Sequence, residues 1–260
     1  MTPILLLGAG RMGGAIIDGW RLTGAVSTSD LIIRDPNLDE TFVASGAQLN
    51  PDPKVLKTAK TVILAVKPQV WRAVAEDVSG LLAKDAVIVS IVAGVSSQDL
   101  SQAFGDRVVA RVMPTTAVAV AKGTVSVYAT TPEARALAHQ LFDPIATTVD
   151  LTDEGLMHAA TAVSGSAPAY LYALVEALEG AGVSQGLTPE AAAELARSTI
   201  VGAAALMGAS DTPPAELRRQ VTSPNGTTQA ALDILLGENG LPRMMTHAVT
   251  AAVKRSRELG

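Results

Sequence analysis

The fold of this chain is decided by residues 4–13, which read Ile4-Leu5-Leu6-Leu7-Gly8-Ala9-Gly10-Arg11-Met12-Gly13. Four apolar residues predict a short buried strand, and three glycines follow at the spacing G-x-G-x-x-G before a helical segment. In such a turn the first glycine allows the tight bend, the second lets backbone approach a pyrophosphate, and the third lets the helix pack on the strand. The helix N-terminus then offers free N–H groups to phosphate. We therefore predict a dinucleotide-binding loop with six cofactor-binding residues, Gly8, Ala9, Gly10, Arg11, Met12 and Gly13.

Short β-branched runs alternate with helical segments through the rest of the first half. Five apolar runs are bounded by Gly, Pro, Asp or Ser, at 4–7, 31–33, 62–66, 86–92 and 108–112. A later pair at 124–128 and 147–151 flanks a helical segment at 133–142 and is expected to complete the far edge of the sheet. Strands that alternate with helices indicate βαβ units. The sequence thus predicts an α/β protein with an N-terminal Rossmann-type, mostly parallel sheet over residues 1–152.

Ala-rich helical segments replace the β-branched runs beyond residue 153. They cover 156–181, 189–208, 227–236 and 242–258, with turns at 186–189, 211–214 and 237–240. Asp153 and Glu154 are interpreted as an acidic pair at a helix start, and Thr188 before Pro189 as a helix cap. We predict a second, all-helical domain over residues 153–260. Because helices this rich in Ala and Gly bury little surface alone, we expect two copies to pair through it.

The composition limits the partners of the chain. A net charge of −5 over 260 residues argues against nucleic acid, which requires a basic surface. The chain has no cysteine, so disulfides, thiolate metal sites and a cysteine nucleophile are excluded, and the composition is compatible with a reducing compartment. The apolar run at 4–7 is too short for a signal peptide, and no run approaches the about 20 apolar residues of a membrane span. We expect a soluble, cytoplasmic protein without a membrane partner.

The three histidines do not form a metal-binding pattern. His139, His158 and His247 are too far apart in the sequence to form a helical pair, and no adjacent carboxylates support one. We therefore predict structural roles for all three and no metal site. Trp20 and Trp71 are interpreted as packing residues, and Tyr170 as lining either a site or a dimer core.

The end of the second predicted strand selects the cofactor. An acidic residue there would bind the ribose 2′-hydroxyl of NAD. The chain instead offers Arg34, followed by Asp35. A guanidinium suits the 2′-phosphate of NADP, so Arg34 is predicted to bind it and NADPH is the expected cofactor, with NADH also used. The alternative is that Arg34 is a solvated charge and that Asp35 binds the ribose.

Three further loops follow predicted strands, at 65–69, 90–95 and 111–114. Ligands of open α/β sheets bind beyond the carboxyl ends of the strands, so all three loops are expected on the cofactor side. Lys67 is interpreted as part of a shaped wall rather than as a general acid. The predicted cofactor-binding residues in these loops are Ala65, Val66, Lys67, Pro68, Ala93, Gly94, Met113 and Pro114.

Two motifs of the helical half complete a specific set. They are S-G-S-A-P-A-Y at 164–170 and S-P-N-G-T-T at 223–228, and they join V-K-P at 66–68. In this order, from residue 4 to residue 258, the set resembles the pyrroline-5-carboxylate reductase family. The resemblance implies an NAD(P)H-dependent reduction of 1-pyrroline-5-carboxylate to L-proline, the last step of proline biosynthesis. It also implies a homodimer through the helical domain, and a larger ring such as a decamer.

The segment at 223–228 has the chemistry that this substrate would need. Residues 223–226 form a predicted turn, and the helix start after them would offer N–H groups to a carboxylate. The hydroxyl of Thr228 would meet the ring nitrogen while hydride reaches the neighbouring carbon, so Thr228 is the predicted catalytic residue. The alternative is an ordinary helix cap without a ligand. The predicted substrate-binding residues are Ser223, Asn225, Gly226, Thr227 and Thr228.

Two positions depart from the family's usual pattern. Asn225 stands where the family usually has glycine, and asparagine is the residue after glycine that best tolerates positive φ. Thr115 stands where the family usually has asparagine after Met-Pro, so an amide contact near the nicotinamide is in doubt.

Three other functions compete with the reduction of 1-pyrroline-5-carboxylate, and the first is the reduction of another imine. β-Hydroxyacid dehydrogenases share the plan of a Rossmann domain followed by helices, but they carry a lysine base on the interdomain helix, and residues 162–175 contain no lysine. A nucleotide-binding regulator without catalytic activity is the third alternative. The presence of Ser223, Thr227 and Thr228 argues against it.

Overall fold

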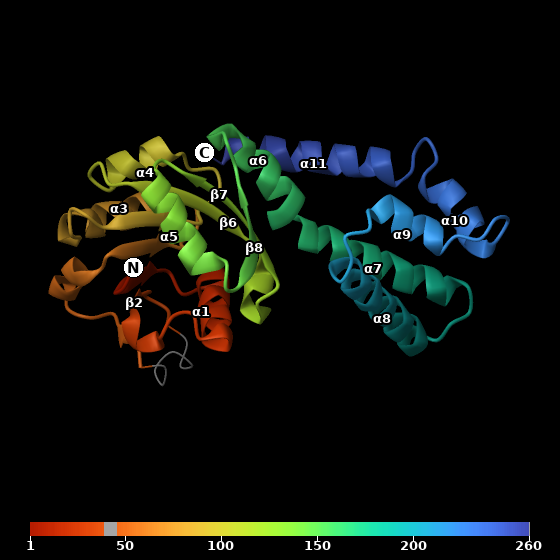
Figure 1. Cartoon of the computed structure of the whole chain (residues 1–260), viewed down its shortest axis with the longest axis horizontal. Coiled ribbons are helices and arrows are strands. Elements are labelled where there is room, and N and C mark those ends of the chain that lie inside the picture. The colour runs from red at the N-terminus through yellow and green to blue at the C-terminus, as the bar shows by residue number, and fades with distance from the viewer. Residues whose placement is uncertain (39–45, 260) are drawn as a thin grey trace. The chain divides into compact units, whose positions relative to one another are not determined.

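The computed structural model of the chain describes residues 1–38 and 46–259, which pack into two compact units (Figure 1). The sheet unit consists of Met1–Gly165 together with the residues from Ala252 onward, and the helical unit is Ser166–Ala251. The predicted domain boundary between residues 152 and 153 remains a prediction, because compact units are defined by contacts within the chain and need not coincide with domains.

Within the described residues, the sheet unit contains an eight-stranded sheet of order β3-β2-β1-β4-β5-β6-β7-β8. Its strands are β1 (Ile4–Leu7), β2 (Leu31–Arg34), β3 (Gln48–Leu49), β4 (Thr61–Leu64), β5 (Val87–Ser90), β6 (Val109–Pro114), β7 (Gly123–Ala129) and β8 (Ala146–Asp150). In this part of the chain β6 and β7 are antiparallel and the other neighbours are parallel. The predicted α/β class is confirmed, and β7 and β8 complete the far edge as expected. The two-residue strand β3 was not predicted.

The antiparallel pair follows from the length of its connection. Residues 115–122 link β6 to β7, whereas a parallel connection needs about a dozen residues or more. The link from β7 to β8 contains α5 (Pro132–Phe142), so it is long enough for a parallel crossover. The capping hydroxyl of Thr131 accepts from the N–H of Ala134 and starts this helix.

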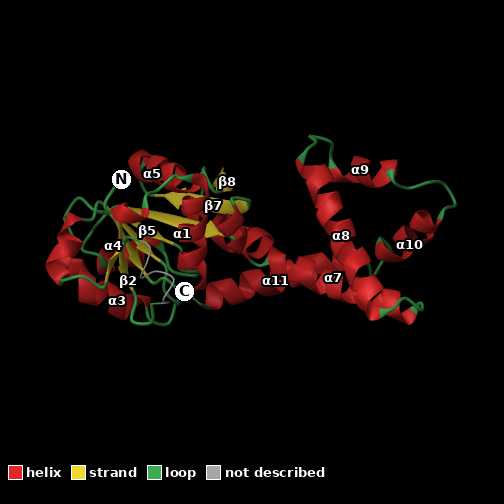
Figure 2. Ribbon diagram, turned by 90° about the horizontal axis from the view of Figure 1, so that it is seen from below, coloured by secondary structure: helices red, strands yellow, loops and turns green. Residues whose placement is uncertain are grey.

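Helices cover both faces of the sheet (Figure 2). One face packs against α1 (Arg11–Thr23) and α5, and the other against α3 (Trp71–Val78) and α4 (Ser97–Ala103). Trp20 of α1 is 1% exposed, and its indole Nε1 donates to the carbonyl oxygen of Leu141 over 2.7 Å. Trp20 and Trp71 are therefore packing residues, as predicted. The shorter helical segments are η1 (Thr28–Asp30), η2 (Pro53–Thr58), η3 (Ser79–Leu81), η4 (Thr116–Val120), η5 (Glu154–Leu156), α6 (Met157–Ala160) and the π-helical turn η6 (Thr161–Gly165).

The second half of the chain is helical, as the sequence predicts. Its helices are α7 (Ala167–Ser184), α8 (Pro189–Gly208), α9 (Pro214–Gln220), α10 (Thr227–Leu235) and α11 (Leu241–Glu258). The hydroxyl of Thr188 accepts from the N–H of Ala191 and caps α8, which confirms that prediction. Helix α9 was missed, because its prolines were interpreted as part of a turn. Proline at the first helical position starts a helix without losing a hydrogen bond.

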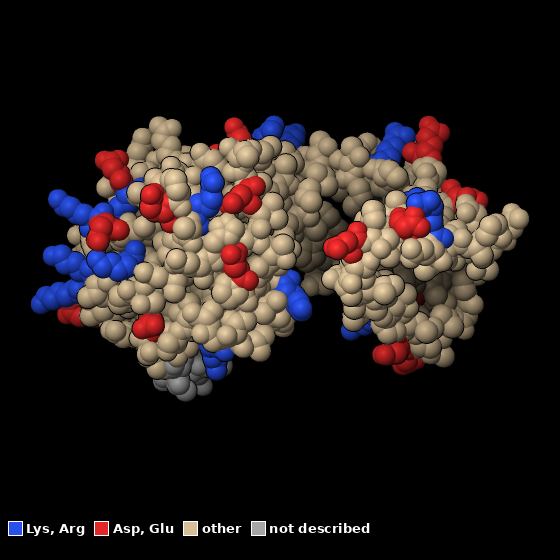
Figure 3. All heavy atoms as spheres, in the orientation of Figure 1, with Lys and Arg blue, Asp and Glu red and all other residues tan. Residues whose placement is uncertain are grey.

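The helical unit buries few side chains within one chain. Helices α7, α9 and α10 contain no buried residue in the part of the chain that the structure describes. Large apolar side chains are exposed instead, including Tyr172 at 66% and Val201 at 69%. Much of the surface of this unit that faces the viewer in Figure 3 carries neither acidic nor basic side chains. Among the described residues, no helix combines the length and the apolar character that crossing a membrane requires.

Candidate functional site

The residues predicted to bind a cofactor follow the carboxyl ends of neighbouring parallel strands. Arg34 ends β2 and Pro114 ends β6, while the glycine loop follows β1. The loop at 65–68 follows β4, and the loop at 91–96 follows β5. Because these five strands are mutually parallel, their carboxyl ends share one edge of the sheet. The structure therefore brings the predicted residues of the sheet unit to the edge at which doubly wound sheets bind ligands.

The three glycines of the loop have different surroundings. Gly8 has a φ of +95°, and a Cβ on it would lie 2.6 Å from the carbonyl oxygen of Ala65. A Cβ on Gly13 would overlap the carbonyl oxygen of Gly8, because α1 packs directly against the loop. A Cβ on Gly10 would meet no described atom within 4 Å. The fold thus requires glycine at positions 8 and 13, whereas Gly10 leaves open space at the N-terminus of α1.

A hollow of 330 Å³ lies beside the glycine loop at the end of β2. Arg34 lines it, and its Nη2 lies 2.7 Å from Oδ2 of Asp77 in α3. The two side chains are 33% and 61% exposed, so the pair is open to solvent. The guanidinium predicted to bind a 2′-phosphate is therefore at the expected edge of the sheet, where a carboxylate holds it.

Asp35 is also part of this hollow and is ordered by its neighbours. Its Oδ2 accepts from the N–H of Ala9 over 2.7 Å, and its Oδ1 accepts from the N–H of Asn37 over 2.7 Å. The amide of Asn50 donates to the carbonyl oxygen of Asp35 and accepts from its N–H. Asp35 thus ties the end of β2 to the glycine loop. Both interpretations of the cofactor, through Arg34 and through Asp35, have a residue in place.

Backbone shape rather than side-chain chemistry characterises the loops after β4 and β5. Lys67 is exposed, and its carbonyl oxygen accepts from the N–H of Val70 over 3.1 Å, which closes a turn. Gly94 has a φ of +83°. The hydroxyl of Ser90 accepts from the N–H of Val92 and orders the start of that loop. This arrangement fits the interpretation of Lys67 as part of a wall.

The end of β6 is shaped by Met113 and Thr115. A Cβ on Gly165 would lie 3.6 Å from Cγ of Met113, so the π-helical turn η6 reaches this strand end. Such turns are frequent at functional sites. The hydroxyl of Thr115 accepts from the N–H of Thr124 over 3.0 Å, and Thr115 is 7% exposed. Thr115 therefore closes the turn between β6 and β7.

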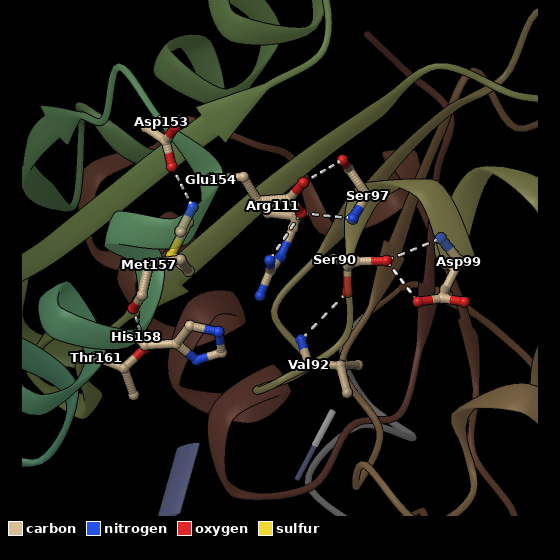
Figure 4. Close-up of polar contacts among 12 residues, drawn as sticks. Ser90, Val92, Ser97, Asp99, Arg111, Asp153, Glu154, Met157, His158 and Thr161 are labelled. Atoms are coloured by element: carbon tan, nitrogen blue, oxygen red, sulfur yellow. Dashed lines mark hydrogen bonds and ion pairs between the residues drawn. The ribbon is translucent and has the colours of Figure 1, made fainter. Parts of the chain in front are cut away.

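A partly buried ion pair joins β6 to Glu154, and the sequence did not predict it (Figure 4). Nη1 of Arg111 donates to Oε1 of Glu154 over 2.7 Å. Ser97, the first residue of α4, donates to the same carboxylate from its N–H over 2.6 Å and from its Oγ over 2.7 Å. Burial raises the pKa of Glu154, but the hydrogen bonds from Arg111 and Ser97 outweigh it and hold the pKa below its usual value.

Asp153 and Glu154 do stand at a helix start, as predicted, since η5 begins at Glu154. Asp153 does cap η5, since its Oδ1 accepts from the N–H of Gly155 over 2.6 Å. The carboxylate of Glu154 also reaches β6 and α4, which the sequence did not predict. A signal for it was present: Arg111 lies in an apolar strand run, and a buried guanidinium requires a partner.

Two histidines of the sheet unit have structural partners, as predicted. His158 lies 3.0 Å through Nδ1 from Oγ of Ser256 near the end of α11. Burial and the nearby charge of Arg111 lower the pKa of His158. His139 lies within 3.2 Å of Asp143 and Asp150, and although its burial lowers the pKa, these carboxylates outweigh that effect and raise it. Within residues 1–38 and 46–259, no group of three acidic or histidine side chains could hold a metal ion.

The predicted substrate segment lies in the helical unit, at the start of α10. Asn225 has a φ of +58°, so it adopts the left-handed backbone conformation that glycine would adopt at this position. Gly226 donates its N–H to the carbonyl oxygen of Ser223 over 3.1 Å, and a Cβ on Gly226 would overlap Oγ of Ser223. No side chain caps α10, whose first two residues are Thr227 and Thr228. Gly226 occupies the N-cap position, so the substrate role of this helix start and the alternative of an ordinary cap without a ligand both stay predictions.

Both halves of the chain match known families. Residues 154–259 match the family described as pyrroline-5-carboxylate reductase dimerisation, and residues 3–94 match that described as NADP oxidoreductase coenzyme F420-dependent. A pyrroline-5-carboxylate reductase from Pseudomonas aeruginosa is 37% identical over 99% of this chain and 97% of its own length. The chain belongs to the pyrroline-5-carboxylate reductase family.

Solved structures of this family have the same fold as the chain. A pyrroline-5-carboxylate reductase from Coxiella burnetii is 29% identical, with a TM-score of 0.90 over 100% of this chain and 98% of that one. A pyrroline carboxylate reductase from Plasmodium falciparum, solved with NADP bound, is 25% identical, with a TM-score of 0.86 over the same shares. The predicted family is confirmed, and with it a nicotinamide-dependent oxidoreductase and a dimerisation domain.

Proposed function

We propose that this protein reduces 1-pyrroline-5-carboxylate to L-proline with NAD(P)H, in the last step of proline biosynthesis. The observation that carries the proposal is the uncapped start of α10 in a chain that belongs to this family along its whole length. The reaction adds a hydride to the carbon of a C=N bond and leaves the proton on nitrogen. It therefore needs a bound dinucleotide, a held carboxylate and a positioned ring nitrogen.

The sheet unit fits the dinucleotide. The open space at Gly10 admits a pyrophosphate next to the N-terminus of α1, where N–H groups and the helix dipole favour negative charge. Gly8 and Gly13 keep the loop in this form. When bound, NAD(P)H supplies the hydride that reduces the imine carbon. The loops at 65–68, 93–94 and 113–114 would bound the nicotinamide and exclude water from it.

The helical unit fits the carboxylate and the ring nitrogen. The first N–H groups of α10 are free of a side-chain cap, so a carboxylate can accept from them. Thr227 and Thr228 are exposed at this helix start. We assign the Thr228 hydroxyl to the ring nitrogen, where it would orient the imine and its proton. Catalysis would then come from positioning and from fixed dipoles rather than from a strong acid.

NADPH is the proposed preference. Arg34 lines the hollow at the end of β2 and offers a planar pair of N–H groups, which suits a phosphate. The relative from Plasmodium falciparum was solved with NADP bound. Asp35 in the same hollow would hold the ribose of NADH, so NADH is the proposed second cofactor.

A homodimer through the helical unit is the proposed assembly. The match to a dimerisation family covers residues 154–259, and the exposed apolar side chains concentrate in the same part of the chain. For this protein, we propose that such dimers assemble further into a decamer. Light scattering after gel filtration separates a dimer from a decamer. We propose a cytoplasmic location, in line with a chain that has no cysteine.

A steady-state assay tests the activity directly. In the reductive direction, purified protein is mixed with NADPH or NADH and with either 1-pyrroline-5-carboxylate or a cyclic imine that has no carboxylate. In the oxidative direction, it is mixed with NADP⁺ or NAD⁺ and with 3-hydroxyisobutyrate. We expect turnover with the carboxylated imine, much less with the unsubstituted imine, and none with the hydroxyacid. If the two imines were reduced at equal rates, the start of α10 would not hold the carboxylate of the substrate. Turnover of the hydroxyacid alone would overturn the proposed reaction.

A further inference from the structure

The partly buried pair of Arg111 and Glu154 ties the loop after β5 to the end of β6 at the ligand edge of the sheet. Ser97 is the first residue of α4 and directly follows the loop at 91–96, while Arg111 lies in β6 shortly before residues 113–114. One carboxylate, that of Glu154, accepts from both: three hydrogen bonds of 2.6–2.7 Å join it to Ser97 and Arg111 (Figure 4).

The loop after β5 and the end of β6 lie on one side of the point at which the strand order reverses. That point is between β1 and β4, because β1 is followed by β2 and β3 on one side and by β4, β5 and β6 on the other. A dinucleotide spans this point, and its adenosine ribose is read at the end of β2. The nicotinamide half therefore belongs to the side of β4, β5 and β6, where Glu154 acts.

We infer that Glu154 is a positioning residue for the nicotinamide half of the cofactor site and that it acts through Ser97 and Arg111. The inference rests on the proposed function. The Arg111 side chain is 5% exposed and that of Glu154 is 26% exposed, so the guanidinium is buried and its charge is paired by a partly buried carboxylate. Because the carboxylate fixes the start of α4 and the middle of β6 at once, it sets the spacing between the loop at 91–96 and residues 113–114 at the end of β6.

A comparison of two ligands tests this role. NADP⁺ contains the nicotinamide, and 2′-phospho-ADP-ribose lacks it but keeps the adenosine half. For Glu154→Gln we expect affinity for NADP⁺ to fall about tenfold and affinity for the fragment to change less than twofold, as measured by calorimetry. The turnover number should fall along with the NADP⁺ affinity. Ser97→Ala removes one hydroxyl and keeps the ion pair, so it should fold well and weaken NADP⁺ binding by a smaller factor in the same direction.

Asp153→Asn is the matched control, because this neighbouring carboxylate caps η5 and asparagine caps equally well. We expect its affinities for NADP⁺ and for the fragment to equal those of the unaltered protein. Equal weakening of both ligands by Glu154→Gln, or a lowered melting temperature with unchanged affinities, would make the pair purely structural and overturn the inference. The unaltered protein's own turnover of the imine decides the proposed function separately.

Discussion

The sheet unit and the helical unit of one chain differ in what they bury. The sheet unit encloses its large side chains, and Trp20, Phe104 and Phe142 are less than 2% exposed. In the helical unit, the buried hydrophobic residues among those that the structure describes are Ala192 and Ala196. Its larger side chains remain on the surface, as Tyr172 and Val201 do.

The difference shows that the two units draw their stability from different sources. Two packed faces of a sheet supply the sheet unit with a core of its own. A helix with apolar side chains around it is stable only when another element covers them. Burying one exposed Val or Leu contributes about 1.5–3 kcal/mol, so covering a few of these residues decides whether the helical unit folds. We propose that a second copy of the chain buries these exposed side chains.

The largest expected effect comes from a charge on the exposed apolar face of α8. Val201 lines an apolar groove with Leu171 and Tyr172. Val201→Asp should prevent pairing and lower activity by on the order of a hundredfold, because an unpaired helical unit loses its cover. Sedimentation and circular dichroism should show a smaller species with less helix, and NADP⁺ should still bind to the sheet unit.

Leu22→Asp is the control for this substitution. Leu22 is 64% exposed on α1 of the sheet unit, close to the 69% of Val201. We expect the control to leave assembly and activity unchanged. If Leu22→Asp and Val201→Asp had equal effects, the contrast between the two units would be wrong.

The second effect tests whether the helical unit contributes to the chemistry as well as to assembly. Thr228→Ala removes one positioned hydroxyl, which should cost about 1–3 kcal/mol, or about ten- to a hundredfold in turnover. Affinity for NADPH should stay nearly the same, because the cofactor residues lie in the sheet unit. Thr228→Ser should keep most of the activity. Full turnover by Thr228→Ala would show that another group meets the imine.

Local patterns explain which parts of this contrast were predictable from the sequence. The first residue of α8 could be predicted from the cap at Thr188 and the proline after it, and the fold class of the sheet unit from the glycine loop. Strand β3 was missed, because two residues, Gln48 and Leu49, carry no periodic pattern. The prolines at the start of α9 did carry a helix-start signal, and it was interpreted as a turn.

The parts of the site that the sequence did not predict depend on distant pairs. Arg111 and Glu154 are 43 residues apart, and only the packing of β6 against the chain that follows the sheet brings them together. Arg34 and Asp77 are likewise 43 residues apart. A motif shows which group is present at a strand end, whereas its partner depends on the fold. The roles proposed for the cofactor and substrate residues remain predictions.

A third effect separates packing from binding within the sheet unit. Gly13→Ala forces a Cβ onto the carbonyl oxygen of Gly8, so we expect a loss of stability of about 1–3 kcal/mol in denaturant unfolding. The Cβ added by Gly10→Ala would meet no described atom within 4 Å, so the free energy of unfolding of this variant should be unchanged. It should nevertheless weaken NADP⁺ binding, because the added methyl group occupies the space proposed for the pyrophosphate. Equal NADP⁺ affinity for Gly10→Ala and the unaltered protein would contradict that placement.

The smallest effect concerns the exposed pair in the sheet unit. Arg34→Ala should raise the KM for NADPH several times more than that for NADH, since only NADPH carries the 2′-phosphate. Asp77→Asn should act in the opposite direction. Exposed ion pairs are worth about 0–1 kcal/mol, so releasing Arg34 from Asp77 should lower the KM for NADPH by at most about fivefold and leave that for NADH unchanged.

Asp85→Asn is the matched control for the release of Arg34. It breaks another solvent-exposed pair, Lys60 with Asp85 at 2.9 Å, and Lys60 precedes β4 at the opposite end of the strands. Steady-state kinetics with both cofactors should give unchanged constants for this variant. If Arg34→Ala raised both KM values equally, Arg34 would act as a general charge near the hollow, and Asp35 would become the residue that reads the ribose. The helical unit should be indifferent to all three variants, because each alters a solvated contact at the surface of a unit with a core of its own.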